Sequence, residues 1–174
     1  MKQQLSEENV KALVTYRLNR AKETLAEVPN IRDMGYYNTA INRLYYACYY
    51  ALVALLIKNQ IQASTHAGVK QMLGLHFVSK GLISRESNRS FSLLFDRRHS
   101  SDYDDFAYAT IEEVDELLPK AKSFISEIES LLLCYADTAL VDIPRDYVEL
   151  DSGEEEVNGR GRDAHAPSGC ANEQ

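Results

Sequence analysis

The feature of this sequence that most constrains its fold is an uninterrupted apolar run, LYYACYYALVALLI, from Leu44 to Ile57. As a helix, this run of 14 residues spans about 21 Å, and it is shorter than the roughly 20 residues that a helix needs to cross a bilayer. Because it is apolar on nearly every side, it is stable in water only when other helices surround it. The run therefore predicts a central core helix, within residues 35–60, and no membrane span.

The rest of the chain predicts an all-α fold. Four prolines and eight glycines are few for a chain of 174 residues built from strands and turns, and apolar residues recur at spacings of three and four. We expect a first helix that is capped by Ser6 and ends at Pro29, and a third that is capped by Ser64 and runs to about Lys80, with Gly81 at its end. A fourth helix should start near Ser84. A capping box of Thr110 and Glu113 predicts a fifth, which continues to about Tyr135 and is kinked or loosened by Pro119.

Composition divides the chain into three parts. We expect a helical bundle over residues 1–136, a short linker or docking segment over 137–150, and a disordered acidic tail over 151–174, since the tail has few large apolar groups. The net charge is −7, of which −4 lies in the tail, so the charge argues against generic attraction to nucleic acid but allows a local basic site. Three widely spaced cysteines indicate free thiols in a reducing compartment, hence a cytoplasmic protein.

Metal and cofactor chemistry finds no support in the sequence. The four histidines are not at metal-ligand spacing from one another or from a cysteine, and no glycine-rich phosphate loop is present. We therefore expect no metal and no cofactor. The paired tyrosines of YYNTAINRLYYACYYALVALL could stack on bases, although such pairs more often fill a core or a subunit interface.

Two stretches carry arginines that need an explanation. Asn42 and Arg43 stand at the start of the apolar run, where an unpaired charge is costly, so Arg43 needs an anionic partner from the protein or from a ligand such as phosphate. In RRHSSDYDD, residues 97–105, a helical count places Arg98 on the apolar face and turns Arg97 toward solvent. Asp102, four residues after Arg98, is either its intrahelical ion-pair partner or its orienter at a phosphate site.

Three blocks in order, NRLYYACYYALVALL, STHAGVKQMLGLHFVSKGLI and LFDRRHSSDYDDF, resemble the HEPN superfamily, in particular its small stand-alone prokaryotic branch, the uncharacterised UPF0332-like proteins. The resemblance covers about residues 5–133. It implies an up-and-down bundle of about five helices that forms a homodimer with an arginine motif at the subunit cleft. It also implies RNA as a ligand and, for many members, metal-independent endoribonuclease activity as toxins of toxin–antitoxin or defence modules.

The family motif is Arg, a polar residue, three to five others, then His. Arg98 and His99 match its start, but Tyr103 stands where the final histidine belongs. RNA cleavage without a metal needs a group that takes the 2′-hydroxyl proton, and a tyrosine with a pKa near 10 is a poor base at neutral pH. We therefore assign Arg98, His99, Asp102 and Tyr103 as candidate catalytic residues, and Asn42, Arg43 and Arg98 as candidate RNA or phosphate contacts.

Two functional hypotheses follow from the resemblance. The first is an RNA-binding or RNA-cleaving toxin component that acts as a homodimer with Arg98 at the cleft. The alternative is a non-catalytic HEPN adaptor that binds a minimal nucleotidyltransferase antitoxin or is modified by it with AMP, on Tyr103 or Tyr108. A third hypothesis, a nucleotide pocket within the monomer, uses Arg43 and the tyrosines of the central helix.

Overall fold

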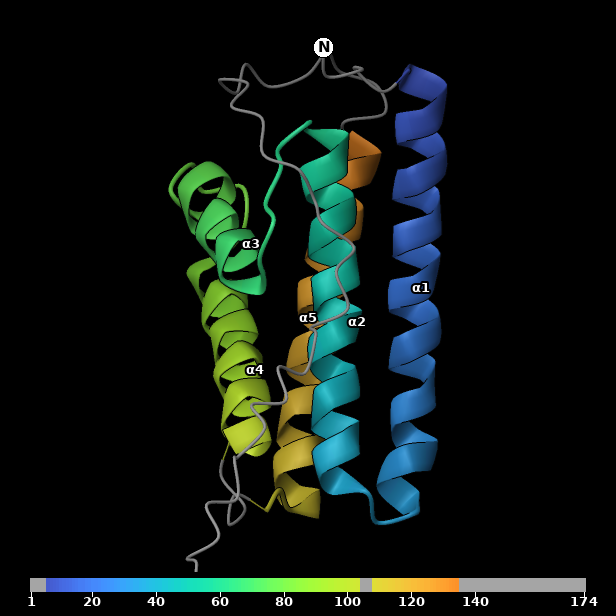
Figure 1. Ribbon diagram of the computed structural model, residues 1–174, viewed down its shortest axis with the longest axis vertical. Coiled ribbons are helices and arrows are strands. Elements are labelled where there is room, and N and C mark those ends of the chain that lie inside the picture. Colours follow the sequence, from blue (N-terminus) through green and yellow to red (C-terminus); the bar gives the residue numbers. More distant parts are fainter. Residues whose placement is uncertain (1–5, 104–107, 135–174) are drawn as a thin grey trace, which may run out of the picture.

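The computed structural model is an all-α bundle (Figure 1), which confirms the expected fold class. It describes residues 6–103 and 108–134, with the backbone alone for residues 99–103, so the predicted linker and tail lie outside the described residues. The elements are α1 (Glu7–Asp33), α2 (Tyr37–Lys58), α3 (His66–Met72), a π-helical continuation η1 (Leu73–Val78), α4 (Arg85–Tyr103) and α5 (Ile111–Cys134).

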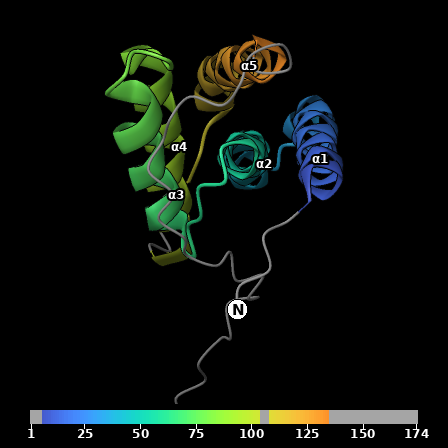
Figure 2. The ribbon, with the colours of Figure 1, turned by 90° about the horizontal axis from the view of Figure 1, so that it is seen from above.

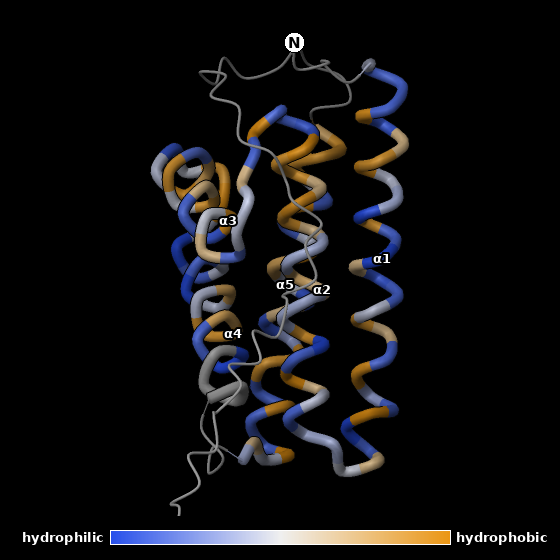
Figure 3. Tube along the Cα trace, viewed as in Figure 1, coloured by the Kyte–Doolittle hydropathy of each residue, from blue (hydrophilic) through white to orange (hydrophobic). Residues whose placement is uncertain are grey.

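Helix α2 lies at the centre of the bundle. Seen from above, it has α1 on one side, α3 and α4 on the opposite side, and α5 on a third side, toward the top of the view (Figure 2). By length and composition α2 is apolar enough to cross a membrane, but two-thirds of its most apolar stretch is buried inside the bundle. Burial of that extent is expected of a core helix, as the apolar run predicted. Apolar residues run along α2 and α5, whereas much of α1 is polar (Figure 3).

Helix α1 begins as predicted and ends later than predicted. Ser6 is the N-cap, with its hydroxyl accepting a hydrogen bond from the amide of Asn9 at 3.3 Å. The expectation that Pro29 ends the helix is wrong, since α1 continues to Asp33. A proline costs one backbone hydrogen bond, and the turn around it is held by the buried Val28 and by an ion pair from Arg32 to Asp115 of α5.

The third helix begins at a different cap and changes its winding. Thr65, not Ser64, is the N-cap, because Thr65 has extended backbone geometry and its hydroxyl accepts from the amide of Gly68 at 2.9 Å. From Leu73 the chain continues as π-helix, which the sequence pattern did not indicate. Gly81 follows with φ of +70°, the left-handed geometry expected of a glycine beyond a helix end.

The start of α4 and the start of α5 follow the predicted capping residues. The hydroxyl of Ser84 accepts from the amide of Ser87 at 3.1 Å, and that of Thr110 accepts from the amide of Glu113 at 3.3 Å. Helix α5 runs through Pro119, which lies on its exposed side, and ends at Cys134. The capping box is only half formed, because the Glu113 carboxylate binds an arginine of α4 instead.

Candidate nucleic-acid interface

Arg98 faces the interior of the bundle, as the helical count predicted. Its side chain is 7% exposed, between α4 and α2. The guanidinium carbon lies 5.6 Å from the ring centre of Tyr45 and 5.4 Å from that of Tyr46. Both distances are within the range of about 6 Å at which a cation is attracted to an aromatic face. The arginine is thus fixed against two rings of the central helix.

Tyr45 is the buried support for this arrangement. Its ring stacks 5.8 Å from Phe91 of α4, and its hydroxyl shares a hydrogen bond of 2.7 Å with Nδ1 of His66. Burial raises the pKa of Tyr45 well above its ordinary value, although the nearby charge of Arg98 acts in the opposite direction. The hydroxyl therefore stays protonated at physiological pH. It can position neighbours, but it cannot serve as a general base.

Three further tyrosines of α2, Tyr46, Tyr49 and Tyr50, form what we call the tyrosine face. Each is half-buried, and their ring centres lie 6.0–6.3 Å apart. Tyr49 also stacks on His66 of α3 at 4.5 Å. The tyrosine face therefore borders α3 and α4, and among the described helices none lies on the side of α2 opposite α5 (Figure 2). Core filling accounts for Tyr45, but only partly for the other three.

Arg97 differs from its neighbour Arg98 and from its prediction. The expectation of a solvated charge is wrong, because the guanidinium makes a two-pronged ion pair with Glu113 of α5: Nε lies 2.5 Å from Oε1 and Nη2 lies 2.7 Å from Oε2. About a quarter of each side chain is exposed. Arg97 therefore links α4 to α5. The helical count turned Arg97 away from the face that carries Arg98, but it did not predict that α5 lies on that side.

The anionic partner that we expected for Arg43 is a residue of the protein itself. Its guanidinium binds Glu27 of α1, with Nε 2.8 Å from Oε2. A phosphate at Arg43 would have to compete with that carboxylate. Asn42, its predicted companion, is half-buried on α2. The role of these two residues in phosphate binding stays a prediction.

The remaining motif residues lie at the edge of the described chain. His99, Asp102 and Tyr103 belong to the last turns of α4, but their side chains are outside the described residues, so their predicted roles stay predictions. Tyr108 is 75% exposed. It lies beside Tyr36 and Tyr37 at the turn between α1 and α2, where they line a shallow hollow. An exposed hydroxyl is what a modifying enzyme needs to reach.

Sequence reasoning missed two residues of this region. His66 was considered only as a metal ligand, and its contact with Tyr45 depends on how α3 folds back on α2, for which the sequence holds no signal. Arg17 did leave a signal. It takes the place of an apolar residue in the stripe of α1, three residues after Val14 and four before the buried Ala21.

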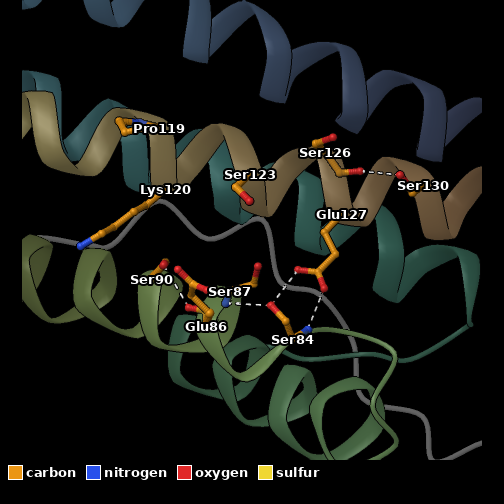
Figure 4. A pocket seen from close by; sticks show the side chains of 10 residues that line it. All are labelled: Ser84, Glu86, Ser87, Ser90, Pro119, Lys120, Ser123, Ser126, Glu127 and Ser130. Carbon is orange, nitrogen blue, oxygen red and sulfur yellow. Dashed lines mark hydrogen bonds between the residues drawn. The ribbon is translucent and has the colours of Figure 1, made fainter.

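On its other side, α4 faces α5 across a groove of about 580 Å³ (Figure 4). Six serines line it, together with Glu86, Pro119, Lys120 and Glu127. Glu127 accepts hydrogen bonds from the backbone amide of Ser84 at 2.7 Å and from its hydroxyl at 3.2 Å. The polar groups of this groove therefore help to hold the start of α4 against α5. Within residues 6–103 and 108–134, no three His, Cys, Asp or Glu side chains are grouped to hold a metal ion.

Comparison with known proteins agrees with the resemblance. A protein of Thermotoga maritima named "UPF0332 protein" is 29% identical over 69% of this chain and 91% of its own length. A protein of Methanocaldococcus jannaschii named "Putative toxin MJ0605" is 30% identical over 72% of this chain and 90% of its own length. A second protein of that organism, named "Putative toxin MJ0142", is 26% identical over 67% of this chain and 79% of its own length. The HEPN domain family matches residues 14–131, and the chain belongs to that family.

Proposed function

We propose that this HEPN protein binds RNA through Arg98 and acts as the toxin component of a toxin–antitoxin or defence module, as a homodimer with Arg98 at the subunit cleft. The observation that carries the proposal is the burial of Arg98 against Tyr45 and Tyr46. A guanidinium held by rings keeps its planar donors in a fixed orientation, which suits the two oxygens of a phosphate. The toxin names of two relatives support the cellular role.

The direct test is RNA affinity with a matched pair of arginine variants. Arg89 is exposed on α4 and lies about two and a half turns before Arg98, so it points to the opposite side of the helix. We expect Arg98→Ala to weaken binding of a labelled RNA by about tenfold to a hundredfold, because a charge-assisted hydrogen bond contributes about 1.5–3 kcal/mol. Arg89→Ala removes the same charge and should have an effect below threefold. Equal effects of the two variants would contradict a specific role for Arg98.

We further propose that the protein cleaves the RNA that it binds, without a metal ion. Arg98 can stabilise the negative charge that develops on the phosphorus oxygens, while His99, the next residue in the sequence, is of a type whose ordinary pKa suits a proton transfer. We expect weak cleavage in the presence of EDTA that disappears in Arg98→Ala and falls in His99→Ala. Cleavage that continues unchanged in Arg98→Ala would rule out this assignment and point to a contaminating nuclease.

A second function is favoured by one sequence observation, the presence of Tyr103 where the family motif has histidine. In that case the chain is a non-catalytic HEPN adaptor that docks a minimal nucleotidyltransferase and accepts AMP on Tyr103 or Tyr108. The modification would place a phosphate near Arg98 and occupy the cleft. Co-expression with a nucleotidyltransferase from the same gene neighbourhood, followed by mass spectrometry of wild type, Tyr103→Phe and Tyr108→Phe, identifies the acceptor. An unmodified wild-type chain argues against the adaptor.

A further inference from the structure

Arg17 is a second arginine that lies among tyrosines. Its guanidinium carbon is 6.0 Å from the ring centre of Tyr16 and 5.9 Å from that of Tyr50. Its Nε is buried and makes no hydrogen bond, and no carboxylate pairs with Arg17 among residues 6–103 and 108–134. A partly buried cation without an anionic partner is costly unless a ligand supplies one.

The surroundings of Arg17 combine positive charge with aromatic surface. Tyr16 is 57% exposed, so it can still accept a stacking partner. Arg20 adds a second positive charge about one turn further along α1, where Glu23 binds it at 3.1 Å. Positive charge beside an exposed ring is the combination that holds unpaired nucleotides, with the phosphate on the cation and the base on the ring.

This group of residues is continuous with the region around Arg98. The guanidinium carbon of Arg98 lies 5.4 Å from the ring centre of Tyr46, which lies 6.0 Å from the ring centre of Tyr50. The ring centre of Tyr50 lies 5.9 Å from the guanidinium carbon of Arg17. The path crosses the tyrosine face of α2 from α4 to α1. Tyr49 lies close enough to both arginines for their charges to lower the pKa of its hydroxyl, although burial raises that pKa by more. One strand could therefore meet both arginines.

We propose that Arg17, Tyr16 and Tyr50 form a nucleotide subsite that binds an unpaired base and its phosphate on the RNA strand whose backbone reaches Arg98. This inference rests on the proposed RNA-binding function and adds a residue-level requirement to it. Arg17 binds the phosphate, and Tyr16 stacks on the base. The subsite thus selects single-stranded over paired RNA, since a paired base cannot lie flat on Tyr16.

The experiment uses fluorescence anisotropy with a short labelled single-stranded RNA, its duplex, and an abasic ribose-phosphate oligomer of the same length. Arg17→Ala should weaken binding of the single strand about tenfold and reduce its salt dependence by about one phosphate contact. Lys11→Ala is the matched control, since Lys11 is an exposed cation on another side of α1. It should change binding less than twofold.

Tyr16→Leu separates the two parts of the subsite. Loss of stacking should weaken binding of the single strand about fivefold to tenfold and leave binding of the abasic oligomer unchanged. Arg17→Lys should recover part of the affinity that Arg17→Ala loses, since it restores the charge without the planar fork. Equal binding of single strand, duplex and abasic oligomer by the wild type would overturn the stacking role.

The outcomes for the two arginines distinguish the subsite from the underlying function. If Arg98→Ala weakens binding while Arg17→Ala behaves like Lys11→Ala, the subsite is wrong and the proposed function stands. If neither variant changes binding, the proposed function fails with it. Sedimentation velocity on Arg17→Ala decides a further case: if the variant is monomeric where the wild type is dimeric, Arg17 belongs to a subunit interface and the subsite is overturned.

Discussion

Helix α4 meets α5 and α2 in different ways. Toward α5 it uses polar groups that satisfy one another: Arg97 pairs with Glu113, and Ser84 binds Glu127. Toward α2 it presents Phe91 and Arg98 to the aromatic rings of Tyr45 and Tyr46. We call these the polar seam and the aromatic seam. The comparison sets an arginine that is bound to an acid of the next helix, and so links two helices, against an arginine that is packed on tyrosine rings and for which we propose RNA binding.

The largest effect is expected at Phe91, where the two seams share a core. Phe91 is fully buried and stacks both on Tyr45 and on Phe124 of α5, at 5.8 and 5.3 Å. Phe91→Ala should lower the free energy of unfolding by about 3–5 kcal/mol, measured by urea denaturation. Leu93→Ala on the exposed side of α4 is the control and should cost less than 1 kcal/mol. Similar costs at both positions would mean that the two seams do not share one core.

The second effect is alkaline destabilisation, which belongs to α2 and the aromatic seam. Burial raises the pKa of Cys48, Tyr45 and Tyr49 above their ordinary values. Such groups stabilise the folded state fully below their unfolded pKa values, about 8.5–10, and that stability is lost as pH rises above them. We expect the free energy of unfolding to fall by about 3–4 kcal/mol between pH 8 and pH 10.5, since each group contributes up to about 1.4 kcal/mol per pH unit above its unfolded pKa.

A pair of variants tests whether the thiol of Cys48 causes this loss of stability at high pH. Cys48→Ala removes the group that titrates first and should make the decline shallower, whereas Cys134→Ala, at the exposed end of α5, should leave it unchanged. Urea denaturation at four pH values between 8 and 10.5 provides the measurement. A decline that is equally steep in both variants would place its origin outside the buried thiol.

The third prediction separates stability from RNA binding at Arg98. The apolar stem of Met can pack against Tyr45 and Tyr46 as the arginine stem does, so Arg98→Met loses the cation–π attraction, about 1–2 kcal/mol, and keeps the packing. Arg98→Met should therefore unfold within about 2 kcal/mol of the wild type and still lose about 2 kcal/mol of RNA binding energy. Urea denaturation and fluorescence anisotropy on the same preparation give both values. Strong destabilisation by Arg98→Met would make Arg98 a structural residue, like Arg97.

The sequence predicted the aromatic seam better than the polar seam, for a physical reason. The direction of Arg98 follows from helical geometry, because Leu94 and Phe91 on the same face are buried. The partners of Arg97 and Arg43 depend on which helix packs beside them, and a single sequence does not specify that packing. Pro29 misled the prediction of the end of α1, since tertiary contacts at Val28 and Arg32 outweighed one lost hydrogen bond.

The same reasoning explains why the site was only partly predicted. The family motif identified Arg98, but Tyr45, His66 and Arg17 come together only because α1, α2 and α3 fold against one another. Their residue types are common in helices, so no spacing marks them. Arg17 was the exception, as a charge in an apolar stripe, and that stripe position is a signal that can be sought in other helical bundles.

The smallest effect tests the polar seam itself. Glu113→Gln removes the charge that pairs with Arg97 but keeps the shape of the side chain and the amide that Thr110 caps. Because both partners are about a quarter exposed, the variant should lose about 1 kcal/mol of stability, and less at high salt. RNA affinity should stay within twofold of the wild type. If Glu113→Gln instead changes RNA binding as much as Arg98→Ala, then Arg97 also reaches the RNA, and the distinction between acid-paired and tyrosine-held arginines does not hold.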